Sequence, residues 1–283
     1  MCLSPSLGVA AAVAGLLSVG AALLAMPDAS LLWAVVTLAA LAGHALAASG
    51  TPRVRWSVAA GAGLFALVAA ANLLWHRERV ADAGEPLGSQ AATRTYLVES
   101  LREGLDQQRL TAWGLALGVL LLSVAVPASP ARGGRRGVVT TVLAVAVLVW
   151  CGLSVAATPG DPPLPELLLA LQPALLAALV TAGVLASSGW RGDRRGLLTA
   201  GMVLLAVVAV RACADLASTW ASWWAFVEPA RDAFLQPGFM VSVGGSAGGA
   251  LEVSSAVETA VALGGAGLAV AGVLRASREN ARP

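Results

Sequence analysis

The chain has 283 residues, of which 58% are hydrophobic and 12% charged, and its mean hydropathy is +0.78. Soluble domains carry about 25% charged residues, so this composition excludes soluble globular, disordered and nucleic-acid-binding proteins. The formal net charge is +2 and all 18 basic residues are arginine. The expected surroundings are a lipid bilayer, and no nucleic acid is expected as a partner.

Eight long apolar runs follow one another along the chain. A helix needs about 20 apolar residues to cross a bilayer, and backbone groups in lipid must be paired within the protein, so each run is expected to be a helix. The fold class predicted is all-α, one membrane domain over residues 1–283 that bundles about eight transmembrane helices. The expected spans are residues 7–26, 30–49, 54–75, 110–127, 138–157, 164–187, 197–219 and 251–273.

Arginine is concentrated around alternate ends of these runs. The segments around residues 50–55, 128–137 and 188–196 and the C-terminal tail together hold eleven arginines and two acidic residues. The segments at the opposite end hold six arginines and twelve acidic residues. The positive-inside rule therefore predicts that both termini are cytoplasmic. The exclusive use of arginine suggests GC-rich coding, so we expect a bacterial inner (plasma) membrane.

The first of two long outer segments covers residues 76–109. Within it Leu97, Val98, Leu101 and Leu105 share one helical face, which is typical of an amphipathic helix. We expect this helix to lie on the outer membrane surface or to dock on the bundle. It serves either as a plain connector or as a segment that gates a substrate or binds a partner.

The second long outer segment covers residues 220–250 and opens with Trp220, Trp223 and Trp224, followed by Glu228. It is expected to be an interfacial anchor with a flexible link, or alternatively a lid over an outward-facing cavity.

The stretch WASWWAFVEP, with Trp220, Trp223, Trp224, Glu228 and Pro229, resembles the tryptophan-rich outer motif of cytochrome c haem-handling proteins. The resemblance covers about ten residues. Those families place histidines on both sides of the motif, whereas here His76 is the only outer histidine and none follows the segment. The resemblance implies haem handling, and this departure from the family pattern puts haem handling in doubt.

The simplest interpretation of each of the two histidines is a structural role. His44, near the cytoplasmic end of the second run, is expected to be a packing residue whose polar groups are satisfied. His76, at the outer end of the third run, is expected to be interfacial, with a proton relay or ligation as the alternative.

Charged residues inside the seventh and eighth runs form the main candidate site. Arg211 and Asp215 are spaced i,i+4 on one helical face, and Glu258, on the neighbouring span, is expected to bracket Arg211 together with Asp215. Asn72 is expected at a similar depth. One interpretation is a structural ion-pair cluster between helices. The other is an outward-opening polar site for a cation, a proton or a polar solute.

The order of spans and loops in residues 1–136 resembles that in residues 137–283, which suggests a parallel repeat of four spans each. In such a repeat residues 63–75 would overlay residues 201–213.

Three functions are weighed from the sequence. The first is a structural or accessory subunit of a membrane complex, which would contact another membrane protein or a second copy of the chain. The second is a permease for a small solute or ion that uses Arg211, Asp215 and Glu258. The third is a membrane enzyme or haem-handling protein. The sequence nominates no catalytic residue, metal ligand or cofactor.

Overall fold

The computed structural model describes residues 3–48, 51–82, 90–125, 135–157, 164–190, 196–227 and 248–280. In these ranges it contains eight helices and no strand, which confirms the all-α prediction. The helices are α1 (Leu3–Leu23), α2 (Pro27–Ala47), α3 (Pro52–Asp82), α4 (Gln90–Val124), α5 (Arg135–Ala156), α6 (Leu164–Trp190), α7 (Gly196–Val227) and α9 (Gly248–Asn280). Seven of them are long and apolar enough to cross a membrane, as a multi-pass membrane protein requires.

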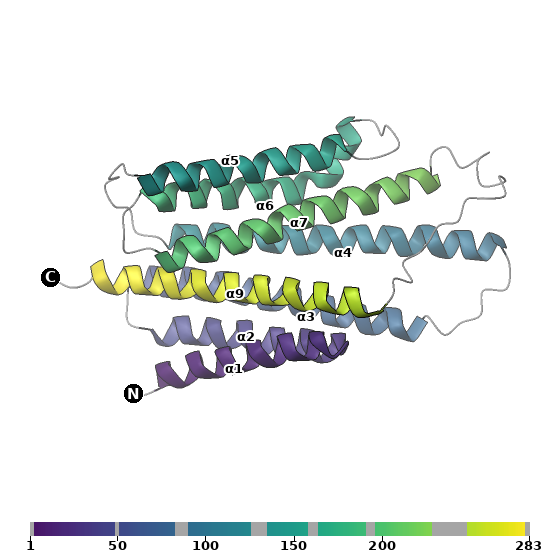
Figure 1. Ribbon diagram of the computed structural model, residues 1–283. Helices are drawn as coiled ribbons and strands as arrows, with labels where there is room; N and C mark the ends of the chain where they lie inside the picture. Colours follow the sequence, from purple (N-terminus) through teal and green to yellow (C-terminus); the bar gives the residue numbers. More distant parts are fainter. Residues whose placement is uncertain are drawn as a thin grey trace.

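Helix α4 is the one that does not meet this length and composition criterion over its described residues. Its apolar part was expected as a span over residues 110–127, but Gln107, Gln108 and Arg109 directly precede it in the same helix. With 35 residues, α4 is about 50 Å long and extends beyond the bundle at one end (Figure 1). It nevertheless runs along the bundle and packs against α3, α6 and α7.

The helices lie side by side, and each packs against its neighbour in sequence within residues 3–124 and again within residues 135–280. Figure 1 shows α1 and α2 along one edge, α5 and α6 along the opposite edge, and α3, α4, α7 and α9 between them. Both ends of the chain lie at the same end of the bundle. An even number of helices that alternate in direction accounts for this placement.

Helices α1 and α2 are joined by a tight turn. The Met26 N–H donates to the Ala21 carbonyl (2.9 Å), the bond that closes a Schellman motif, and Ala25 has a positive φ of 53°. Pro27 then opens α2, where its fixed φ suits the first helical turn. The hydroxyl of Ser18 donates to the carbonyl of Ser30 (2.7 Å) and ties the two helices together near the turn.

Glycines allow close approach between neighbouring helices. A Cβ on Gly201 of α7 would lie 2.4 Å from the backbone nitrogen of Ala269 in α9, and a Cβ on Gly272 would lie equally close to the nitrogen of Leu198. Between α3 and α4, a Cβ on Gly118 of α4 would lie 2.1 Å from the ring of Phe65 in α3. Small residues at such contacts are how membrane helices maximise packing without a hydrophobic driving force.

The first long outer segment is not a separate element. Residues 76–82 extend α3, residues 90–109 are the first part of α4, and residues 83–89 lie outside the described ranges. The expected apolar face does turn toward the protein, because Leu105 is buried in the core and Val98 and Leu101 are half-buried. Around Leu105 the segment docks on the bundle, the second of the two expected arrangements, whereas its position relative to the membrane surface stays a prediction. The side chain of Leu97 lies outside the described part.

The second long outer segment also begins inside a helix. Helix α7 continues to Val227 and α9 begins at Gly248, so the tryptophans belong to α7 rather than to a loop. Residues 228–247, with Glu228, lie outside the described ranges.

Packing partly follows the scheme that a repeat of residues 1–136 and 137–283 would produce. Helix α4 packs against α6 and α7, and α9 packs against α2 and α3. A two-fold axis along the bundle would relate the first two of these contacts to the second two. The match is incomplete because α1 packs against α9 and α5 against α7. The repeat stays a prediction.

The close contact between α7 and α9 generates the first test. Gly201→Ala should lower the free energy of unfolding by about 1–3 kcal/mol, because the added methyl group meets backbone atoms that cannot rotate away. Gly183→Ala on α6, where a Cβ meets no atom within 4 Å, should be neutral or stabilising by up to about 1 kcal/mol. Tryptophan fluorescence during unfolding in detergent measures both. Equal effects of the two variants would contradict the close approach.

Candidate functional site

Arg211, Asp215 and Glu258 form one ionic cluster. The Nε of Arg211 lies 3.0 Å from Oδ2 of Asp215, one helical turn further along α7. Its Nη2 lies 3.3 Å from Oε1 of Glu258 on α9. The i,i+4 spacing supplies the first contact and the packing of α7 on α9 supplies the second. The cluster holds two carboxylates and one guanidinium, a formal charge of −1.

This cluster lies on the outside of the bundle. The side chains of Arg211, Asp215 and Glu258 are 57%, 40% and 48% exposed, although all three lie within apolar stretches that could span a membrane. On α7, Ser218 and Ser222 continue the exposed polar face toward the end of the helix. We call the surface formed by Arg211, Asp215, Ser218, Ser222 and Glu258 the α7/α9 polar face.

The outward-opening polar site expected from these residues stays a prediction. Their charged groups contact one another. They are not among the residues that line the apolar groove beside α1 or the cavity of about 200 Å³ in the bundle, both formed by described residues. As the chain stands alone, the cluster is paired internally and faces outward.

Asn72 belongs to a different site. Its Nδ2 donates to Oγ1 of Thr111 (3.3 Å), and its Oδ1 accepts from Nε2 of Gln107 (3.3 Å). The Thr111 hydroxyl lies 3.0 Å from the Gln107 carbonyl, which closes the network between α3 and α4. Asn72 and Thr111, with Thr259 of α9, are the polar side chains that line the cavity of about 200 Å³, whose other lining is apolar. The polar groups here bond to the protein itself.

The three tryptophans of α7 pack as a group. The rings of Trp220 and Trp224 are stacked with centroids 5.2 Å apart, and Trp223 is tilted against Trp220 at 6.3 Å. Trp220 is only 4% exposed and is part of the hydrophobic core. The placement of these residues in an outer loop, which the haem-handling resemblance requires, is therefore wrong, because they lie within α7.

His76 lies near a carboxylate that the sequence had not singled out. Its Nε2 is 3.9 Å from Oδ1 of Asp28, and Nε of Arg77 is 4.0 Å from the other oxygen of that carboxylate. Asp28 lies in the first turn of α2 and His76 lies near the end of α3, so the antiparallel packing of the two helices brings them together. The separation exceeds a hydrogen bond, and the pair lies at a surface where Asp28 is 53% exposed.

Two further groupings were missed by sequence reasoning. Gln107 and Thr111 are polar residues one turn apart at the start of an apolar run, a spacing that could have indicated an inward-facing pair. Cys151 of α5 and Cys213 of α7 are both buried, on two helices that pack against each other, which nothing in their spacing indicates. Among the residues that the structure describes, no group of three or more His, Cys, Asp or Glu side chains could hold a metal ion.

Comparison with known protein families found no match, and neither the curated proteins nor the solved structures gave one.

The Asn72 network generates a second test. Asn72→Ala and Gln107→Ala should each lower the free energy of unfolding. The double variant should lower it by about 0.6 kcal/mol less than the sum of the two single effects, because a hydrogen bond between membrane helices couples its two partners by about this amount. Unfolding in detergent–denaturant mixtures measures the four proteins. Asn72→Ala combined with Ser18→Ala, from the separate α1–α2 hydrogen bond, should be additive. Equal coupling in the Asn72/Gln107 pair and in the Asn72/Ser18 pair would contradict a direct hydrogen bond between Asn72 and Gln107.

Proposed function

We propose that this chain is a structural or accessory subunit of a membrane complex and that the α7/α9 polar face binds a transmembrane helix of another membrane protein. The observation that carries this proposal is the cluster of Arg211, Asp215 and Glu258, which is about half-exposed on the outer surface of two membrane-compatible helices.

The cost of exposing charge to lipid supports a covered face. A single charged residue at the centre of a membrane helix costs about 2.5–3.5 kcal/mol on insertion scales, and such residues usually face a protein neighbour or a water-filled cavity. Mutual pairing of the three side chains reduces this cost but leaves their outer surfaces uncovered. A partner helix would cover them and supply further polar contacts to Ser218 and Ser222.

The charge of the cluster favours a different protein over a second copy as the partner. A symmetric dimer through this face would bring together two clusters, each with a formal charge of −1. A transmembrane helix that carries one arginine or lysine would instead neutralise the surplus carboxylate. The proposed partner is therefore a membrane protein with one basic residue at the corresponding depth.

We further propose that the bilayer is a bacterial inner membrane and that both termini are cytoplasmic. The arginine-rich segments support this orientation through the positive-inside rule. Arg53 and Arg55 at the start of α3 and Arg275 near the end of α9 belong to the end of the bundle that holds both chain ends. In this orientation the α7/α9 polar face extends from the outer end toward the membrane centre.

Crosslinking in native membranes tests the proposal. A photoreactive benzoylphenylalanine in place of Ser218, on the α7/α9 polar face, should give one discrete crosslinked product. Its peptides should come from a transmembrane helix with a basic residue. Glu258→Gln should reduce the yield at least fivefold, because the surplus negative charge is then lost and the expected charge pairing weakens.

The matched control places the same photoreactive residue at Val142, which is exposed on α5 and far along the chain from the polar face. This position should give lipid adducts without the discrete product. An equal yield with and without Glu258→Gln would contradict the proposal. Cation flux through liposomes that contain the purified chain, abolished by Glu258→Gln, would instead establish the permease hypothesis.

A further inference from the structure

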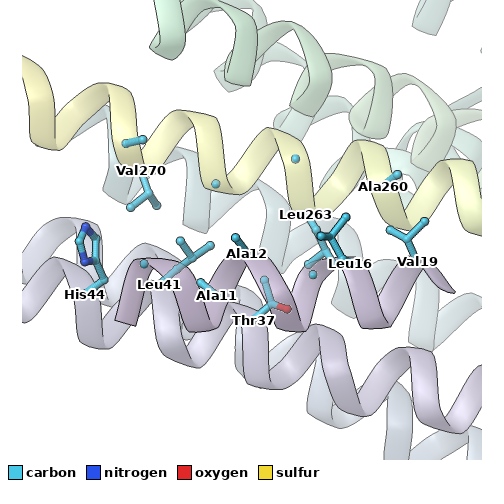
Figure 2. Close-up of a pocket in the computed structure, with 15 residues that line it drawn as sticks. Ala11, Ala12, Leu16, Val19, Thr37, Leu41, His44, Ala260, Leu263 and Val270 are labelled. Carbon is cyan, nitrogen blue, oxygen red and sulfur yellow. The ribbon is translucent and has the colours of Figure 1, made fainter. Parts of the chain in front are cut away.

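A groove runs between α1 and α9, with α2 at its floor, on a part of the surface that the α7/α9 polar face does not include. Its volume is about 460 Å³ and its lining is almost entirely apolar. Figure 2 shows α1 and α9 on its two sides, with His44 at one end and Val19 and Ala260 toward the other.

Small residues create this groove. On α1 Gly8, Ala12 and Gly15 face it, and on α9 Gly264 and Gly267 do so. A Cβ on Gly267 would meet no atom within 4 Å, so this part of the groove is open rather than filled by a neighbouring side chain. The missing side-chain volume therefore leaves a groove that is open at the surface of the bundle.

The length of the groove matches one leaflet of a bilayer. Its lining on α1 extends from Gly8 to Val19, which corresponds to about 16 Å of helix. The hydrocarbon core is about 30 Å thick, so one leaflet contributes about 15 Å. A single lipid chain could therefore lie along the groove over its whole depth.

One end of the groove has a polar lining residue and an arginine one helical turn beyond its lining. His44 of α2 lies against Gly8, where a Cβ would be 3.7 Å from the imidazole ring. On α9, Arg275 follows the lining residue Ala271 by one helical turn and is exposed. This end of the groove is also the arginine-rich end of the bundle, near both chain ends. Basic pockets between membrane helices are typical sites for anionic lipid headgroups.

We propose that the groove binds one anionic phospholipid, with an acyl chain between α1 and α9 and the phosphate near His44 and Arg275. Apolar lining along a leaflet's depth suits the chain, and positive charge at the mouth suits the phosphate. The site joins α1 to α9, the first helix to the last, so the bound lipid would stabilise the contact that closes the bundle. This inference does not depend on the proposed partner.

Native mass spectrometry of the full chain in non-ionic detergent tests the site, with dioleoylphosphatidylglycerol as the anionic probe and dioleoylphosphatidylcholine as the neutral one. The wild-type chain should bind one phosphatidylglycerol. Gly267→Leu should weaken this binding at least tenfold, because the new side chain occupies the open groove. Gly183→Leu makes the same change on an exposed, uncrowded surface of α6 and should bind like the wild type.

A second pair of variants tests the headgroup. Arg275→Gln should reduce the preference for phosphatidylglycerol over phosphatidylcholine about fivefold, the effect of one basic residue near an anionic headgroup. Arg53→Gln removes another exposed arginine from the same end of the bundle and should leave the preference unchanged.

The proposal would be overturned by equal lipid binding in Gly267→Leu and Gly183→Leu. It would also be overturned by a wild-type mass of two chains that becomes one chain only in Gly267→Leu, since a second copy would then fill the groove. Inorganic phosphate that displaces the lipid completely would contradict a site anchored by the acyl chain.

Discussion

The close approach of α7 and α9 is the contact on which both candidate surfaces depend. At Gly201 and Gly272 the two helices meet without room for a side chain, so each glycine lies against the backbone of the other helix. This spacing allows Arg211 on α7 to reach Glu258 on α9. It also fixes α9 in the position from which it packs against α1, α2 and α3 and so closes the bundle between its first and last helices.

Helix α9 has two different exposed environments as a result. Beside α7 it contributes a carboxylate to a paired ionic cluster, and beside α1 it contributes glycines to an apolar groove. The physical demands of these surfaces differ. Charge at membrane depth is stabilised by polar contact with protein, whereas an open apolar groove is stabilised by hydrocarbon chains. The two surfaces therefore suit two kinds of neighbour, a polar membrane helix and a lipid.

Individual residues show how far sequence reasoning reached. The i,i+4 spacing of Arg211 and Asp215 indicated their pairing directly, because one helical turn sets the distance. The position of Asn72 was expected from depth alone, yet depth does not specify which side of a helix a residue occupies. Asn72 therefore bonds to Thr111 and Gln107 within the bundle, apart from the ionic cluster. Trp220 was expected in a loop because it lies at the end of an apolar run, whereas α7 continues to Val227 and Trp220 is buried in the core.

The sequence by itself determined that the chain is a bundle of long helices, because apolar run length and backbone hydrogen bonding are local constraints that lipid makes strict. It also determined which segments are rich in arginine. Only the tertiary structure decided which helix faces meet: that Asn72 bonds to Gln107, that His76 approaches Asp28, and that Gly267 borders an open groove rather than a packed contact. In runs of alanine, leucine, valine and glycine, many rotations about the helix axis place apolar residues against a neighbour. The choice among them depends on contacts between residues distant in sequence.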